Sequence, residues 1–115
     1  AQLGLALLNE KDKHYTEAYD GINSLIEQYP DSAMAYAARG GIEKERGMLE
    51  LAEFDYAKAM ELDAGNEDFA FNHVDILIQL GRKDEAYRDL KKLLDAGCQP
   101  GRLQNFYARL KKKKK

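Results

Sequence analysis

The chain of 115 residues contains little of what many specialised protein classes depend on. It has one cysteine, Cys98, so no internal disulfide can form and the fold does not depend on an oxidising compartment, which leaves the compartment open. Two prolines and nine glycines are too few for a disordered or loop-rich chain. No apolar run approaches the roughly 20 residues that a membrane span needs. The length fits one domain, able to bury roughly two thirds of its unfolded surface.

Motifs that carry catalysis or bind a cofactor are also missing from the sequence. We find no phosphate-binding glycine loop, no nucleophile elbow and no zinc motif. The two histidines, His14 and His73, lack a cysteine or a second histidine at ligand spacing, and His73 falls where a helix would pack. Cys98 has no resolving cysteine, and we interpret it as a spare thiol. We therefore expect no enzyme, no cofactor and no metal site.

Positive charge is scarce outside the last five residues, Lys111 to Lys115. The net charge is −2, and without this lysine tail 13 basic residues face 20 acidic ones, a net charge of −7. An acidic body opposes nucleic-acid binding, and the tail lacks the interleaved aromatic residues on which single strands stack. We interpret the tail as a solvated helix end, with binding to nucleic acid or to an anionic membrane as the alternatives.

What the sequence does contain is a period of 34 residues. Ala18, Ala52 and Ala86 are separated by two equal steps of that length. Each copy therefore predicts a helix with one buried face, and a period held over three copies indicates a repeat array. Apolar residues recur at the same spacings after each alanine, as Ile22, Tyr56 and Leu90, then Leu25, Ala59 and Leu93, then Ile26, Met60 and Leu94.

This pattern resembles the tetratricopeptide repeat, a helix-turn-helix unit of 34 residues with the pattern W-x2-L-G-x2-Y, then A-x3-F, then P. The resemblance covers nearly the whole chain and implies an all-α fold, a right-handed α-α superhelix. The second half of the pattern matches at Ala18, Ile22 and Pro30, at Ala52 and Tyr56, and at Ala86 and Leu90. The first half matches Tyr36 and Gly40 but meets Arg39 and Glu43 at the leucine and tyrosine places, and the third copy holds Ala70, His73, Val74 and Leu77.

The period divides the chain into three repeats and a cap. Repeat 1, residues 1–32, is incomplete at its N-terminus and holds helices at 3–10 and 15–28, joined by a turn at Lys11 to His14. Repeats 2 and 3, residues 33–66 and 67–100, form hairpins whose first helices span 33–46 and 67–80. A capping helix at 101–110 and the tail at 111–115 follow. Because the chain begins at Ala1 within a helix, we expect a domain of a longer protein or a processed product.

Three residues of these hairpins have a predicted structural role. Ser32 and Asn66 stand just before helices, where their side chains can accept a hydrogen bond from a free backbone N–H. Gly40 stands inside a helix, where glycine costs about 1 kcal/mol relative to alanine. We interpret Gly40, with Ala52 facing it, as the point of closest approach between the two helices of repeat 2.

In this family the first helices of the hairpins line a concave surface, and this implied groove is the candidate binding site. Its predicted residues carry small, aromatic and charged side chains: Ala37, Gly41, Lys44, Phe71, Asn72, Asp75, Arg102 and Asn105. Such a surface suits a peptide or helix of a partner protein, with Phe71 as its anchor. The alternatives are that these residues only pack helices together, or that the chain is an architectural module that self-associates through its first helix.

One subgroup of the family grips the C-terminal carboxylate of chaperones with lysine, asparagine and arginine on successive first helices. The corresponding places here hold Leu3, Leu7, Ala38, Asp68 and Asn72. Because Asp68 would repel a carboxylate, we expect that this protein does not bind chaperone tails.

Overall fold

The computed structural model describes the backbone of residues 2–112 and the side chains of residues 14–112. The predicted all-α fold class is confirmed, since this part of the chain contains no strand. Its elements are α1 (Gln2–Gln28), α2 (Ala33–Glu45), α3 (Leu49–Leu62), α4 (Glu67–Gln79), α5 (Lys83–Asp95), the 3-10 turn η1 (Pro100–Leu103) and α6 (Gln104–Lys111). None of these helices is long and apolar enough to cross a membrane. Residues 113–115 of the predicted lysine tail lie outside the described part.

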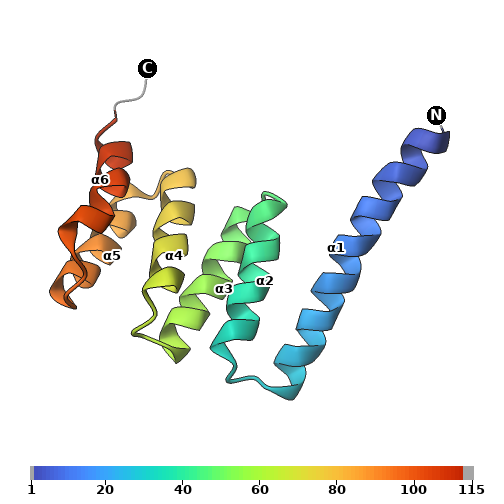
Figure 1. The fold of residues 1–115 in the computed structure, drawn as a ribbon, viewed down its shortest axis with the longest axis horizontal. Coiled ribbons are helices and arrows are strands. Elements are labelled where there is room, and N and C mark those ends of the chain that lie inside the picture. The colour runs from blue at the N-terminus through green and yellow to red at the C-terminus, as the bar shows by residue number, and fades with distance from the viewer. Residues whose placement is uncertain (1, 113–115) are drawn as a thin grey trace.

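The helices stand side by side in a row and run alternately up and down, from α1 at one end to α5 and α6 at the other (Figure 1). The pairs α2 with α3 and α4 with α5 form hairpins, while α1 packs on α2, α3 on α4, and α6 on α4. The array measures 50 × 42 × 20 Å, and its radius of gyration is 16.5 Å, against about 13 Å for a compact domain of this length. An extended stack of hairpins of this kind is a helical-repeat fold.

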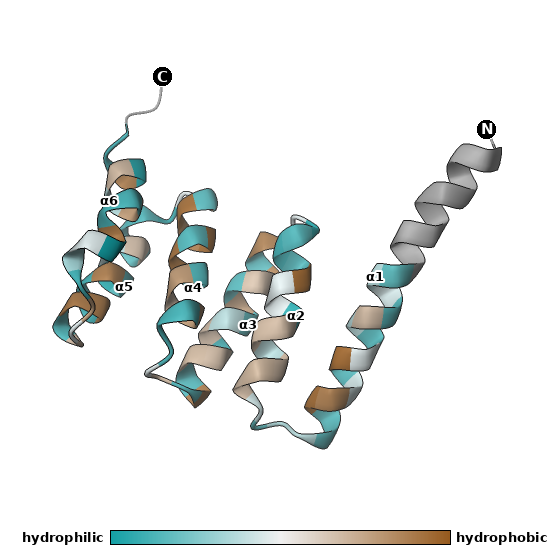
Figure 2. Cartoon of the chain, in the orientation of Figure 1, coloured by the Kyte–Doolittle hydropathy of each residue, from teal (hydrophilic) through white to brown (hydrophobic). Residues whose placement is uncertain are grey.

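Two apolar clusters hold the array together, and small residues let the helix backbones approach within them. Ala52, Ala59 and Ala86 are all 0 % exposed. Figure 2 shows apolar residues recurring along α4 and α5, as expected of helices with one buried face. The first cluster joins α2, α3 and α4 through Ala37, Ala52, Tyr56, Ala59, Phe69 and Ile76. The second joins α4, α5 and the C-terminal segment through Ala70, Val74, Leu77, Ala86, Leu90, Leu93, Cys98, Leu103 and Leu110.

The first helices of repeats 2 and 3 begin at the residues that the sequence marks. Ser32 accepts a hydrogen bond on Oγ from the backbone N–H of Ala35 at 3.2 Å. Asn66 accepts one on Oδ1 from the backbone N–H of Phe69 at 3.1 Å. Both predicted caps are therefore confirmed, and each satisfies one of the free donors at a helix start.

Glycines fix where α2 and α4 end. Gly47 and Gly81 follow these helices in the left-handed region, at φ +80° and +79°. The next residue then bonds back to the helix, Met48 N–H to the Glu43 carbonyl at 2.8 Å and, one period later, Arg82 N–H to the Leu77 carbonyl at 2.9 Å. This is the Schellman arrangement, and a residue with a side chain would pay roughly 1–2 kcal/mol to adopt the left-handed conformation.

The turn predicted at Lys11 to His14 is wrong, because α1 runs through it as one helix of 27 residues. Position 13, one period before Gly47, is a lysine, so the residue that ends α2 has no counterpart in α1. Ala18 consequently has no helix of its own hairpin above it and is exposed, unlike Ala52 and Ala86. The first repeat is thus a single helix, and the expected equivalence of the three alanines fails at its first member.

The C-terminal cap exists but is not the single helix that we expected over 101–110. Pro100 to Leu103 form the 3-10 turn η1 instead, and α6 begins only at Gln104. Pro100 suits the start of this turn because a proline has no N–H to leave unpaired there. Leu103 and Leu110 are 0 % and 3 % exposed, so the segment covers the apolar face of the last hairpin, as the end of a repeat array requires.

Candidate functional site

Side chains from α2, α4 and the η1–α6 segment meet on one side of the array, which we call the inner face. Positions one period apart form rows across it, so that each helix contributes one residue to each row. The rows are Met34, Asp68 and Arg102, then Ala38, Asn72 and Phe106, then Gly41, Asp75 and Arg109. The contacts that follow tie these helices together across this face.

A charged ladder of Lys44, Asp75 and Arg109 crosses the inner face from α2 through α4 to α6. Nζ of Lys44 lies 2.7 Å from Oδ2 of Asp75, and Nη1 of Arg109 lies 2.7 Å from Oδ1. Burial alone would raise the pKa of Asp75, but the bonds from Lys44 and Arg109 outweigh burial, so this pKa lies below its ordinary value. Asp75 is therefore charged at neutral pH and holds a cation on either side.

An aromatic pair lies beside the ladder. The rings of Phe71 on α4 and Phe106 on α6 are 5.8 Å apart between centroids. The guanidinium carbon of Arg102 sits 4.8 Å from the centroid of Phe71, within cation-π range. Arg102 is also paired with Glu67 at the start of α4. Phe71, predicted as an anchor for a partner, is therefore half-buried and held by its own chain on two sides.

The other predicted groove residues differ in how far a partner could reach them. Ala37 is only 9 % exposed and belongs to the first apolar cluster. A β-carbon at Gly41 would lie 3.4 Å from the hydroxyl of Tyr56, so this position touches the core on one side. Asn72 accepts a hydrogen bond from Lys44 at 3.1 Å and is half-buried, whereas Asn105 is exposed on α6. The structure brings Lys44, Asn72 and Asp75 together and leaves Ala37 in the core.

Phe106 is an inner-face residue that sequence reasoning did not place there. The amphipathic pattern of 102–110 puts it with the apolar side of the cap, and it does pack against the second cluster. The signal that would have found it is the period itself, because Phe106 follows Asn72 by one step of 34 residues.

α1 carries a row of exposed residues that we call the α1 stripe: Ala18, Leu25 and Tyr29. Leu25 is 45 % exposed and Tyr29 61 %, and Ala18 is exposed as well. One period after Ala18 and Leu25, Ala52 and Ala59 are 0 % exposed and lie in the cluster that joins α3 to α2. Within the described residues nothing covers the α1 stripe in the way that α2 covers α3.

A half-buried arginine joins α1, α2 and α3 on the other side of α2. Arg39 donates from Nε and Nη2 to the two carboxylate oxygens of Asp55, at 2.8 Å each. Its third nitrogen, Nη1, donates to Oδ1 of Asn23 at 2.9 Å. A bidentate arginine–carboxylate pair of this geometry is among the stronger polar contacts in proteins, so it fixes the angle between these helices.

Glu43 is the buried acid of the same region. It is 1 % exposed, accepts the hydroxyl hydrogen of Tyr19 on Oε2 at 2.5 Å, and has no partner for Oε1 within the described part. Desolvation, with a smaller contribution from the hydrogen bond to Asp55, raises the pKa of Glu43 to about 7. The chain therefore keeps a carboxyl group that is partly protonated at neutral pH inside its core.

The partners of His73 differ from those of a catalytic histidine. Its Nδ1 bonds to Asp89, as in a general base, but its Nε2 lies 2.9 Å from Oε2 of Glu53, where a nucleophilic hydroxyl or thiol would have to stand. Cys98 is 4 % exposed, and burial raises the pKa of its thiol, which disfavours the reactive thiolate. Among the side chains that the structure describes, no group could hold a metal ion. The polar contacts described here join helices and bind no reacting atom.

Comparison with known proteins finds the fold but no sequence family. No protein-family model and no curated protein matches the chain. Among solved structures it is similar to the TPR domain of Arabidopsis OM64, with 24 % identity and a TM-score of 0.73 over 89 % of this chain and 84 % of that one. It is also similar to the Yersinia enterocolitica type III secretion chaperone SycD, in complex with a peptide of the translocator YopD, with 19 % identity and a TM-score of 0.68 over 93 % of this chain and 82 % of that one. The predicted tetratricopeptide-like fold is thereby confirmed.

Proposed function

We propose that this protein is a non-catalytic interaction module that holds a peptide or helix of a partner protein against its inner face. The observation that carries the proposal is the prearranged surface itself, with Phe71 held against Phe106 beside a charged ladder. Side chains that are already fixed lose little entropy when a partner binds, so such a surface favours association.

The open part of the inner face lies toward α2. Met34 is 69 % exposed there, and Ala38 and Gly41 have too little volume to fill the space next to it. An apolar side chain of the partner would bury Met34, while Lys44 and Asp75 offer one charge of each sign to set the direction of the segment. The SycD structure contains a bound peptide, which supports the view that this fold can hold one.

Selection of binders from a random peptide library, followed by calorimetry, tests the proposal. Met34→Asp places a charge on the inner face and should weaken the selected peptides at least about tenfold, the effect of losing a contact at the centre of an interface. Leu51→Asp is the matched control, because Leu51 is 51 % exposed on α3 and lies outside the inner face. Peptides that tolerate Met34→Asp but fail on Leu51→Asp would place binding elsewhere and overturn the proposal.

A second candidate function, self-association, is favoured by the α1 stripe. The sequence of residues 3–8 on the same helix is leucine-rich, although the side chains of Leu3 and Leu7 lie outside the described residues. An antiparallel pair of α1 helices related by a two-fold axis would bring the leucine-rich part of each copy to the stripe of the other. The protein would then be an architectural module, with the second copy as the helix that the first repeat lacks.

Sedimentation velocity over a range of concentrations separates this candidate from the first. If α1 pairs with a second copy, Leu25→Asp should disperse a concentration-dependent dimer, and Leu51→Asp, with a similar exposure on α3, should leave it intact. A monomer at all concentrations, or a dimer indifferent to Leu25→Asp, would exclude self-association through α1.

A further inference from the structure

His73 on α4 sits between two carboxylates that belong to different helices. Its Nε2 lies 2.9 Å from Oε2 of Glu53 on α3, and its Nδ1 bonds to Asp89 on α5. The histidine side chain is 9 % exposed, and those of Glu53 and Asp89 are 19 % and 12 % exposed. One imidazole therefore connects the second helix of repeat 2 with both helices of repeat 3, away from bulk water.

Only the protonated ring can satisfy both carboxylates. A neutral imidazole has one N–H and one bare nitrogen, whereas the imidazolium has two N–H donors. With a carboxylate at each nitrogen, loss of the proton turns one hydrogen bond into a contact between two acceptors. In a partly buried site neither acceptor can turn to water without cost, so deprotonation of His73 loosens one of its two helix contacts.

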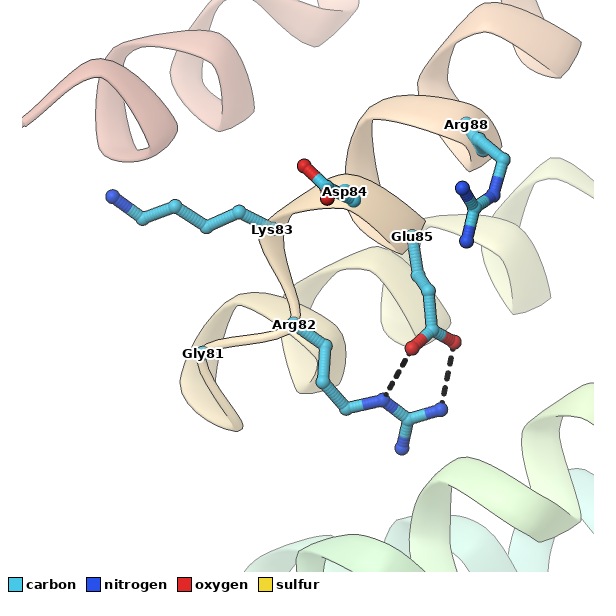
Figure 3. Close-up of a pocket in the computed structure, with 6 residues that line it drawn as sticks. All are labelled: Gly81, Arg82, Lys83, Asp84, Glu85 and Arg88. Carbon is cyan, nitrogen blue, oxygen red and sulfur yellow. Dashed lines mark hydrogen bonds and ion pairs between the residues drawn. The ribbon is translucent and has the colours of Figure 1, made fainter.

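The charged groups around the site do not replace the lost proton. Arg82, at the start of α5, reaches Oε1 of Glu53 at 3.4 Å, but its other nitrogens hold both oxygens of Glu85, at 2.8 and 2.7 Å (Figure 3). Lys92 and Glu61 line the same cleft as His73 and Asp89, one of either sign. Within the described side chains Asp89 bonds to His73 alone, so the histidine is the cation on which Asp89 depends.

The same junction one repeat earlier is built with a cation that does not titrate. Arg39 occupies the place 34 residues before His73, and its partner Asp55 stands 34 residues before Asp89. An arginine keeps its charge at every pH that a protein tolerates, whereas histidine changes charge near neutrality. Replacement of the arginine by histidine thus makes one of two equivalent junctions sensitive to pH.

We propose that His73 is a pH-dependent fastener, which when protonated holds repeat 3 against repeat 2 and which releases part of that hold when it loses its proton. The helices held in this way, α4 with α5, carry Phe71 and Asp75 of the inner face on the side opposite to His73. The proposal concerns the joint between repeats and stands whether or not the inner face binds a peptide.

The direction of the effect follows from the site. Burial alone would lower the pKa of His73, but the hydrogen bonds from Asp89 and Glu53 outweigh burial and raise it above the ordinary 6.5. A histidine with a raised pKa in the folded state stabilises the fold fully below the unfolded value of 6.5, and this contribution is lost as pH rises through the folded value. The repeats should therefore hold together less firmly on the alkaline side.

Urea unfolding of the whole chain between about pH 6 and pH 8.5 tests the proposal, since the ordinary pKa of histidine lies within that span. The wild-type equilibrium constant for unfolding should rise about tenfold more over this range than that of His73→Arg, which copies Arg39; tenfold is the effect of one hydrogen bond to a charged group. Glu43 is present in both proteins, so its own titration cancels in the comparison. His14→Gln, which removes the other, exposed histidine, should keep the wild-type profile.

Two results would overturn the proposal. One is a pH profile of His73→Arg that runs parallel to that of the wild type. The other comes from NMR of the histidine rings, which needs no variant of position 73 to fold: a His73 signal whose midpoint lies at or below pH 6.5 would show that the two carboxylates do not favour the cation. A midpoint above 6.5 that falls on Asp89→Asn, assigned with His14→Gln, is the expected result.

Discussion

Gly40 on α2 lies against the ring of Tyr56 on α3, so closely that a β-carbon at position 40 would stand 2.8 Å from Cδ2 and 2.9 Å from Cε2 of that ring. Tyr56 is 6 % exposed and belongs to the first apolar cluster, so its ring has little freedom to move aside. The same β-carbon would stand 3.4 Å from the carbonyl oxygen of Ala52. This confirms the expectation that Gly40 marks the closest approach of the two helices, with Ala52 facing it.

Gly40→Ala should therefore destabilise the protein even though alanine is the better helix former. Overpacking of a filled core costs about 1–3 kcal/mol, which exceeds the gain of about 1 kcal/mol in helix propensity at most of that range. Gly21→Ala is the matched control, because a β-carbon at Gly21 of α1 would meet no atom within 4 Å. Urea denaturation followed by circular dichroism should show opposite signs for the two variants. Equal stabilisation by both would mean that α2 and α3 lie farther apart than described.

The buried Glu43 predicts a pH dependence below that of His73. Its folded pKa of about 7 is raised from 4.5, so the folded chain binds this proton more tightly than the unfolded chain does. The free energy of unfolding should therefore fall as pH rises from about 4.5 to above 7. Glu43→Gln should remove this slope from urea titrations at a series of pH values, and Glu27→Gln, at an exposed position of α1, should leave it. Parallel slopes for the wild type and Glu43→Gln would contradict the burial.

The cap predicts a large stability difference between two apolar residues. Leu103→Ala should cost about 2–5 kcal/mol, the range for a leucine truncated in a filled core, because Leu103 is 0 % exposed beneath the last hairpin. Met34→Ala removes a side chain that is 69 % exposed and should change stability by no more than about 0.5 kcal/mol. Thermal or urea unfolding measures both. A Leu103→Ala variant as stable as Met34→Ala would show that η1 and α6 do not seal the array.

The sequence predicts the middle of the fold best because local chemistry and the period agree there. Helices α2 and α4 begin at Ser32 and Asn66 and end before Gly47 and Gly81, all of which are visible in the sequence. The first repeat fails because extension of the period to residues 11–14 overlooked that the glycine of the later turns is replaced by a lysine. A period predicts where a turn could fall, and only a turn-forming residue makes the helix end there.

The candidate site was less predictable, since its residues are defined by what they touch. Lys44 and Asp75 were predicted as groove residues, but that they bind each other depends on the distance between α2 and α4. The place of His73 at a packing position was foreseen, while its carboxylate partners, 20 and 16 residues away in sequence, were not. Such contacts join different helices, and no pattern within one helix encodes them. Comparison of His73 with Arg39 across one period would have indicated them.

Chaperone tails give the last prediction, because the inner face contradicts their known mode of recognition in this family. The only neutral polar residue at the corresponding places, Asn72, already accepts a hydrogen bond from Lys44 and donates one to the carbonyl of Asp68 at 3.0 Å. The Asp68 side chain is exposed and would repel a carboxylate. A fluorescent acidic peptide with a free C-terminus should therefore show no saturable anisotropy change below about 1 mM, the same as its amidated form. Micromolar binding of the free form that is lost on Asn72→Ala would refute this, and would assign to Asn72 a role for which its present hydrogen bonds leave no room.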